Sequence, residues 1–169
     1  MLKIINDLSP FFEDCYRRIN VREYARLIRV TPPTASKMLD YYASEGLLLK
    51  SRYKNYILFY ADKSSKILIY LSRIYWRQRL KELINYMEKQ LVSPAIVLFG
   101  SLSKAEVKED SDFDLAIFAN KRKLDIKNFE SKLKRTIQLH WFKSLSEIKN
   151  KELANNIANG HILMGRLKL

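Results

Sequence analysis

The feature that most constrains the fold is a polar segment that separates two short apolar runs in the C-terminal half of the chain. The first run, residues 95–99, ends at a Gly-Ser pair, and the second, residues 113–118, overlaps an Asp-Phe-Asp sequence at 112–114. Apolar runs of this length predict buried β-strands. Because side chains two residues apart on a strand project from one face, the two carboxylates are expected side by side where the second strand begins.

The residue types in this segment suit phosphate and metal chemistry. Gly100 lets the backbone approach a triphosphate, and Ser101 can bond a phosphate oxygen; a short helix expected after Ser101 would add free amide donors. The carboxylates of Asp112 and Asp114 repel each other unless cations lie between them. Oxygen ligands suit Mg²⁺, which binds phosphates through one or two carboxylates, and two such ions can clamp the attacking and leaving oxygens of a displacement at phosphorus.

The stretch from Phe99 to Leu115 resembles the signature of the polymerase-beta-type nucleotidyltransferase superfamily in its minimal form. It contains Gly-Ser, an intervening helix and Asp-x-Asp in the same order and spacing, and the resemblance extends over about residues 94–165. The resemblance implies that Gly100 and Ser101 hold the nucleotide and that Asp112 and Asp114 bind the metal. Ala105 departs from the family, because members often carry glycine at this position.

A third carboxylate, which this family carries on a later strand, has no obvious counterpart in the sequence. In the family it helps to bind the catalytic metal and activates the attacking hydroxyl. The expected strand 136–142 directs Gln138 and His140 to one face. His140 is either a general base near neutral pH or a purely structural side chain, and imidazole is a poor ligand for Mg²⁺. Glu147 and Glu152 are alternatives if the fold brings them close.

The N-terminal third carries the start and stop signals of two helices followed by a hairpin. Asn20 with Glu23 three residues later forms a capping box for a helix over residues 20–28. Thr31, followed by proline, begins a second helix, and Gly46 ends it. Two short strands are then expected around a polar turn at residues 51–55.

The second of these helices presents a small, polar outer face, and the hairpin turn carries cations. Both features suit binding of double-stranded DNA, with the helix in the major groove and the turn on the backbone or minor groove. The residues expected to contact DNA are Pro33, Thr34, Ser36, Lys37 and Tyr41 on the helix and Arg52 and Lys54 on the turn. Residues 1–61 resemble winged helix-turn-helix domains of prokaryotic, particularly archaeal, regulators. The alternative is a helical domain for dimerisation or protein contacts.

Residues 62–92 read as a long helical region whose apolar face changes side along its length. One side of the region is formed by Ile67, Leu71, Ile74 and Tyr75. Roughly opposite lie Leu80, Leu83, Ile84, Met87 and Leu91. Such a helix either bridges two domains or bends near 76–79, and it either supplies a homodimer interface or packs within the chain. We therefore expect an α+β protein: a winged helix-turn-helix over 1–61, a connecting helix over 62–92, and a small mixed-sheet nucleotidyltransferase-like α/β domain over 93–169.

The bulk composition limits the partners and the location. A net charge of +13 favours a polyanion. Cys15 is the single cysteine, which excludes an internal disulfide and a cysteine-based zinc site. No apolar run reaches the roughly 18 residues of a membrane span. The N-terminus lacks the pattern of a signal peptide, so a cytoplasmic location is the expected default.

Two functions fit these features. The first is an enzyme that transfers a nucleotidyl group from an NTP to a hydroxyl with Mg²⁺; the resemblance implies a role as an antitoxin that modifies a toxin partner. The second is a non-catalytic transcriptional regulator whose nucleotidyltransferase fold at most binds nucleotide. Both would hold for an antitoxin that represses its own operon.

Overall fold

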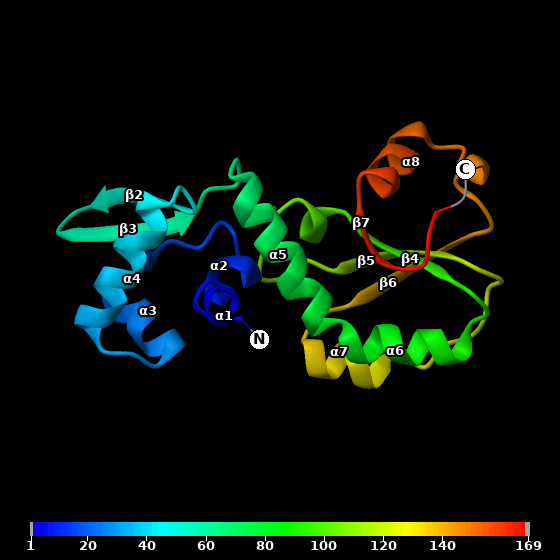
Figure 1. The fold of residues 1–169 in the computed structure, drawn as a ribbon, viewed down its shortest axis with the longest axis horizontal. Helices are drawn as coiled ribbons and strands as arrows, with labels where there is room; N and C mark the ends of the chain where they lie inside the picture. Colours follow the sequence, from blue (N-terminus) through cyan, green and yellow to red (C-terminus); the bar gives the residue numbers. More distant parts are fainter. Residues whose placement is uncertain (1, 168–169) are drawn as a thin grey trace. The chain divides into compact units, whose positions relative to one another are not determined.

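The computed structural model describes residues 2–167 and divides into two compact units. The first unit runs to Tyr75 and also includes the short segment Ala105–Glu109, whereas the second comprises Trp76–Lys104 and the chain from Asp110 onward (Figure 1). Helices and two separate sheets confirm the α+β class. The division falls inside helix α5 (Lys66–Arg79), so the predicted connecting region is shared between the two units.

The first unit combines helices with a three-stranded antiparallel sheet of order β1-β3-β2. Its further elements are α1 (Lys3–Asp7), α2 (Ser9–Glu13), β1 (Ile19–Asn20), α3 (Val21–Ile28), α4 (Pro32–Ser44), β2 (Leu48–Tyr53) and β3 (Tyr56–Ala61). Two tyrosine hydroxyls converge on Asp7 inside this unit. Tyr24 donates to the Asp7 carbonyl at 2.9 Å, and Tyr42 donates to Asp7 Oδ2 at 2.7 Å, which ties α1 to α3 and α4.

The starts of α3 and α4 lie where the capping signals predict them. The side chain of Asn20 accepts a hydrogen bond from the Glu23 amide at 3.0 Å. Thr31 caps α4 in the same way, and prolines occupy its first turn. The inner face of α4 buries Ala35, Leu39 and Tyr42.

The hairpin turn is shorter than the predicted turn at residues 51–55. Strand β2 continues to Tyr53, which faces Tyr56, so the turn is only Lys54-Asn55. Arg52 therefore lies on the strand, opposite Ile57, rather than on the turn. The cross-strand pairs of β2 and β3 account for the difference, because aromatic and β-branched partners extend the ladder through positions that look polar in one strand alone.

The second unit is built on a mixed four-stranded sheet of order β6-β5-β4-β7. Its elements are α6 (Lys81–Gln90), β4 (Ala95–Phe99), the 3₁₀ turn η1 (Ser101–Ser103), β5 (Phe113–Phe118), α7 (Lys127–Leu133), β6 (Ile137–Phe142), the 3₁₀ turn η2 (Leu145–Glu147), α8 (Lys151–Ala158) and β7 (His161–Met164). Strands β5 and β6 are parallel, and β4 is antiparallel to both β5 and β7. Helices α6 and α7 cover one face of the sheet, and α8 covers the other (Figure 1).

The two faces of the sheet have different residues because side chains alternate along each strand. On the α8 face, Val97, Phe99 and Ala116 pack with Ile157 of α8. On the other face, the ring of Trp76 contacts Phe113 edge-on at 5.3 Å.

The predicted long helix is broken. Its predicted second face is buried throughout, whereas in its predicted first face Tyr75 is buried and two isoleucines are exposed. Leu80 separates α5 from α6, next to the predicted bend. Ile67 and Ile74 are 61% and 39% exposed, while Leu68 and Ser72 are buried instead. Helix α5 carries apolar residues on several of its faces, so the spacing of these residues alone does not predict which face is buried. Within residues 2–167, no helix has the length and apolar character needed to cross a membrane.

Candidate active site

The predicted phosphate turn and carboxylates come together at one edge of the sheet in the second unit. The end of β4 lies beside the start of β5, because Phe99 pairs with Asp114. The start of the parallel strand β6 lies on the other side of β5, with Gln138 paired to Asp114. One sheet edge therefore carries the turn, the aspartates and the polar residues of β6.

Gly100 brings the backbone of the turn directly against an aspartate. It adopts φ 71° and ψ −152°, a conformation that disfavours other residues. A Cβ atom at this position would lie 2.5 Å from Oδ2 of Asp114. The backbone conformation therefore favours glycine, and a Cβ here would force the Asp114 carboxylate to move.

Gln138 contacts the other aspartate. Its Nε2 donates to Oδ2 of Asp112 at 2.7 Å. A carboxylate only accepts hydrogen bonds when ionised, so the amide presents its nitrogen and not its oxygen to Asp112.

His140, two residues beyond Gln138 on β6 and paired with Ala116, lies beside Asp114. Its Nε2 is 3.6 Å from Oδ1 of Asp114, and its ring meets Phe99 edge-on at 5.2 Å between centroids. Both side chains are only partly exposed. The structure thus places Asp112, Asp114, Gln138 and His140 on the same face, as the strand alternation predicts.

The electrostatics at Asp114 favour a cation. Burial raises the pKa of its carboxyl, the imidazole of His140 lowers this pKa, and the nearby Asp112 charge raises it again. A positive ion between the two carboxylates would offset both the burial and the repulsion.

The two aspartates are suitable ligands for Mg²⁺, but a third protein ligand is missing. Asp112 and Asp114 supply carboxylate oxygens, which together with substrate phosphates are the usual ligands of this ion. Over residues 2–167, however, no three acidic, histidine or cysteine side chains form a group that could hold a metal. Glu147 and Glu152 therefore do not supply the missing carboxylate; Glu147 instead accepts a hydrogen bond from the Lys143 amide.

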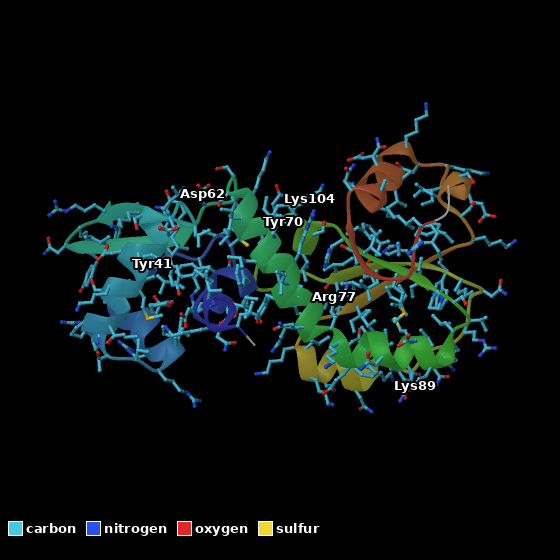
Figure 2. All side chains as sticks on the ribbon, viewed as in Figure 1. Tyr41, Asp62, Tyr70, Arg77, Lys89 and Lys104 are labelled. Atoms are coloured by element: carbon cyan, nitrogen blue, oxygen red, sulfur yellow. The ribbon has the colours of Figure 1, made fainter. Side chains whose placement is uncertain are left out.

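The segment after Gly100 differs from the prediction. The expected helix is only the three-residue turn η1, so the helix N-terminus that was expected to bind anions is not formed there. Ser101 is partly exposed at its start. Lys104 follows, exposed, with its Nζ 2.9 Å from Oδ1 of Asn156 on α8 (Figure 2). Lys104 was not among the predicted site residues, although it lies three residues after Ser101.

The predicted DNA-contacting residues lie in the first unit, on α4 and the β2–β3 hairpin. All are exposed except Ser36, which is partly buried and bonded to Asp40 at 3.4 Å. Tyr41 is 57% exposed on the outer face of α4 (Figure 2). The predicted members of this set are Pro33, Thr34, Ser36, Lys37, Tyr41, Arg52 and Lys54.

Two features of this surface were not predicted. Asp40, the acid on the outer face of α4, is paired with Lys50 of β2 at 2.7 Å. Tyr53 and Tyr56 flank the hairpin turn and are 60% and 55% exposed, with Nζ of Lys54 5.6 Å from the centre of the Tyr53 ring. The hairpin therefore offers aromatic as well as cationic groups.

Comparison with known proteins identifies a family for the second unit. Residues 81–168 match the family model described as polymerase beta, nucleotidyltransferase. No curated protein and no solved structure matches the chain.

Proposed function

Because its family model matches more than half of the sequence, the chain belongs to the polymerase beta nucleotidyltransferase family, and from this premise we propose that the second unit binds an NTP with Mg²⁺ and transfers a nucleotidyl group to a hydroxyl. The observation that carries the proposal is the convergence of Gly100, Asp112 and Asp114. The turn packs so closely on Asp114 that a side chain at position 100 would collide with it.

Each residue of the site has a role in this reaction. Asp112 and Asp114 would hold Mg²⁺, and the bound ion would neutralise charge on the triphosphate. The backbone at Gly100 and the hydroxyl of Ser101 bind phosphate oxygens. The acceptor oxygen attacks the α-phosphorus, the bond from that phosphorus to the bridging oxygen breaks, and pyrophosphate leaves. His140 accepts the proton of the acceptor hydroxyl as a general base.

The acceptor in this proposal is a hydroxyl of a partner protein, such as the toxin of a toxin–antitoxin pair. The two described units are assigned to the nucleotide and to DNA, which leaves no third unit within residues 2–167 for an acceptor. An NTP donor and a DNA partner agree with action in the cytoplasm.

The test is incorporation of label from an NTP into a protein. The purified chain is incubated with Mg²⁺, each α-labelled NTP in turn and a lysate of the cells that make it. We expect a labelled protein band that Asp112→Asn and Asp114→Asn each weaken about 100-fold or more. Asp110→Asn is the matched control, because Asp110 is an exposed acid two residues before the pair. Equal labelling by the wild type and both site variants would remove this proposal.

We further propose that the first unit is a winged helix-turn-helix that binds double-stranded DNA, as a homodimer. The turn-linked pair α3 and α4, the hairpin after it and the exposed polar face of α4 support this proposal. The net charge of +13 also favours a polyanion.

DNA binding is tested with cognate and random duplexes. We expect Lys37→Ala to reduce discrimination between sequences, and Arg52→Ala to weaken binding to all duplexes and to lower the salt slope by about one. Lys3→Ala, on α1, serves as the control for loss of one exposed cation. Equal affinity of the wild type for cognate and random DNA would count against the proposal.

A second candidate, a transcriptional regulator without transfer activity, is favoured by one contact. Gln138 donates a hydrogen bond to Asp112 at a position where another acid would serve metal catalysis. In this case NTP changes the affinity for DNA, and no label is transferred. Measuring DNA affinity with and without a non-hydrolysable NTP analogue, beside the labelling assay, distinguishes the two candidates.

A further inference from the structure

We propose that the nucleotide site holds a single divalent cation because position 138 carries an amide in place of a carboxylate. The inference rests on the proposed function, because it concerns the ion that accompanies a bound NTP. It adds the number of ions and the residue that sets this number.

The position of Gln138 follows from the register of the sheet. Strands β5 and β6 are parallel, and Gln138 is the partner of Asp114 across them. Its side chain reaches to Asp112, two residues before Asp114, and donates at 2.7 Å. Gln138 is therefore next to both aspartates, through its side chain to Asp112 and through the strand pairing to Asp114.

The amide of Gln138 cannot replace a carboxylate as a negatively charged metal ligand. Its nitrogen faces Asp112 and so competes with a cation for Oδ2 of that carboxylate. It contributes no negative charge, and His140, the other polar neighbour, is a poor ligand for Mg²⁺.

The negative charge and the number of ligands that the site supplies are sufficient for one divalent ion but not for two. Two-metal sites hold their ions about 3.5–4 Å apart, which requires anionic ligands that screen the two ions from each other. Asp112 and Asp114 supply two negative charges, and the described residues contain no third acidic side chain grouped with them. Two carboxylates and a triphosphate match the usual environment of one Mg²⁺.

A single substitution tests this inference. Gln138→Glu keeps the length of the side chain and replaces the donor by a carboxylate that faces Asp112. The exposed position of Gln138 makes the change compatible with folding. The three acids would repel one another without cations, so a second ion is expected to bind between the new carboxylate and the aspartates.

The experiment measures the ratio of bound Mn²⁺ to bound nucleotide by equilibrium dialysis, with Mn²⁺ replacing Mg²⁺ and a non-hydrolysable NTP analogue. We expect one ion per nucleotide for the wild type and two for Gln138→Glu. Gln138→Ala removes the amide without adding an acid and should stay at one. Gln90→Glu, the same substitution at an exposed position at the end of α6, should also stay at one. Gln138→Asp is a second acidic variant with the same expected ratio of two.

The measured ratios of ion to nucleotide separate the single-ion inference from the proposed function. A wild-type ratio of two overturns the single-ion inference and leaves the proposed function intact. A ratio of one in both acidic variants, when they still bind nucleotide, also overturns the inference. Absence of bound nucleotide in the wild type instead contradicts the proposed function itself.

Discussion

Gly100 and Gly46 both have a positive φ, 71° and 68°, in very different surroundings. A Cβ at Gly46 would meet no atom within 4 Å, whereas one at Gly100 would collide with Asp114. We expect alanine at either position to cost about 1–3 kcal/mol of stability through backbone strain alone. Only Gly100→Ala should also displace the carboxylate and abolish nucleotide binding. Urea unfolding and nucleotide titration of both variants check this, and normal binding by Gly100→Ala would contradict it.

The pH dependence of stability reports on Asp114. Because burial raises the pKa of this carboxyl in the folded protein, the folded state holds its proton to higher pH than the unfolded state. Its contribution to stability is therefore most favourable below the ordinary pKa of an aspartate and declines as pH rises through the raised pKa. We expect Asp114→Asn to raise the melting temperature at neutral pH in the absence of divalent cations, and to lose this advantage in acid. A melting temperature lowered by Asp114→Asn at neutral pH would show that the His140 contact outweighs burial.

At the scale of single residues, the sequence predicts on which face the residues of the candidate site lie, but not which of them contact one another. Alternation along a strand was enough to place Gln138 and His140 on one face. The sequence could not show that Gln138 contacts Asp112 while His140 contacts Asp114, because these contacts depend on the parallel register of β5 and β6.

At the scale of elements, local signals predicted starts better than extents. Capping residues marked the beginnings of α3 and α4 because the caps act within a few residues of the chain. The extent of β2 depends on its pairing with β3, and the buried side of α5 depends on what packs against it. These long-range effects leave no trace in the local pattern.

The end of α3 allows a stabilising substitution. Arg29 ends this helix in the left-handed conformation, with φ 58°, and its amide donates to the Ala25 carbonyl. Glycine adopts this cap conformation without the steric cost of a Cβ. We expect Arg29→Gly to stabilise the protein by about 1 kcal/mol, measured by chemical denaturation. Arg29→Ala removes the same charge but keeps the Cβ, so equal stability of the two variants would contradict the conformational explanation.

At the scale of the whole molecule, charge is spread along the chain. The excess of cations lies in both units and does not mark a site by itself. The exposed segment between β5 and α7, with Lys121 and Lys123, carries cations far from the predicted DNA-contacting residues in sequence. This distribution explains why the charge predicted a kind of partner but not its location.

A net charge of +13 also predicts how the free protein responds to salt. Like charges repel in the compact state, and raising the ionic strength from about 10 mM to about 150 mM shortens the screening length from about 30 Å to about 8 Å. We expect the melting temperature to rise by a few degrees over this range in sodium chloride. The double variant Lys121→Glu/Lys123→Glu lowers the net charge from +13 to +9, because each exchange removes one positive charge and adds one negative charge. Its salt response should therefore be smaller. A melting temperature that falls with salt would show that attractive ion pairs, not net repulsion, dominate the electrostatics of the fold.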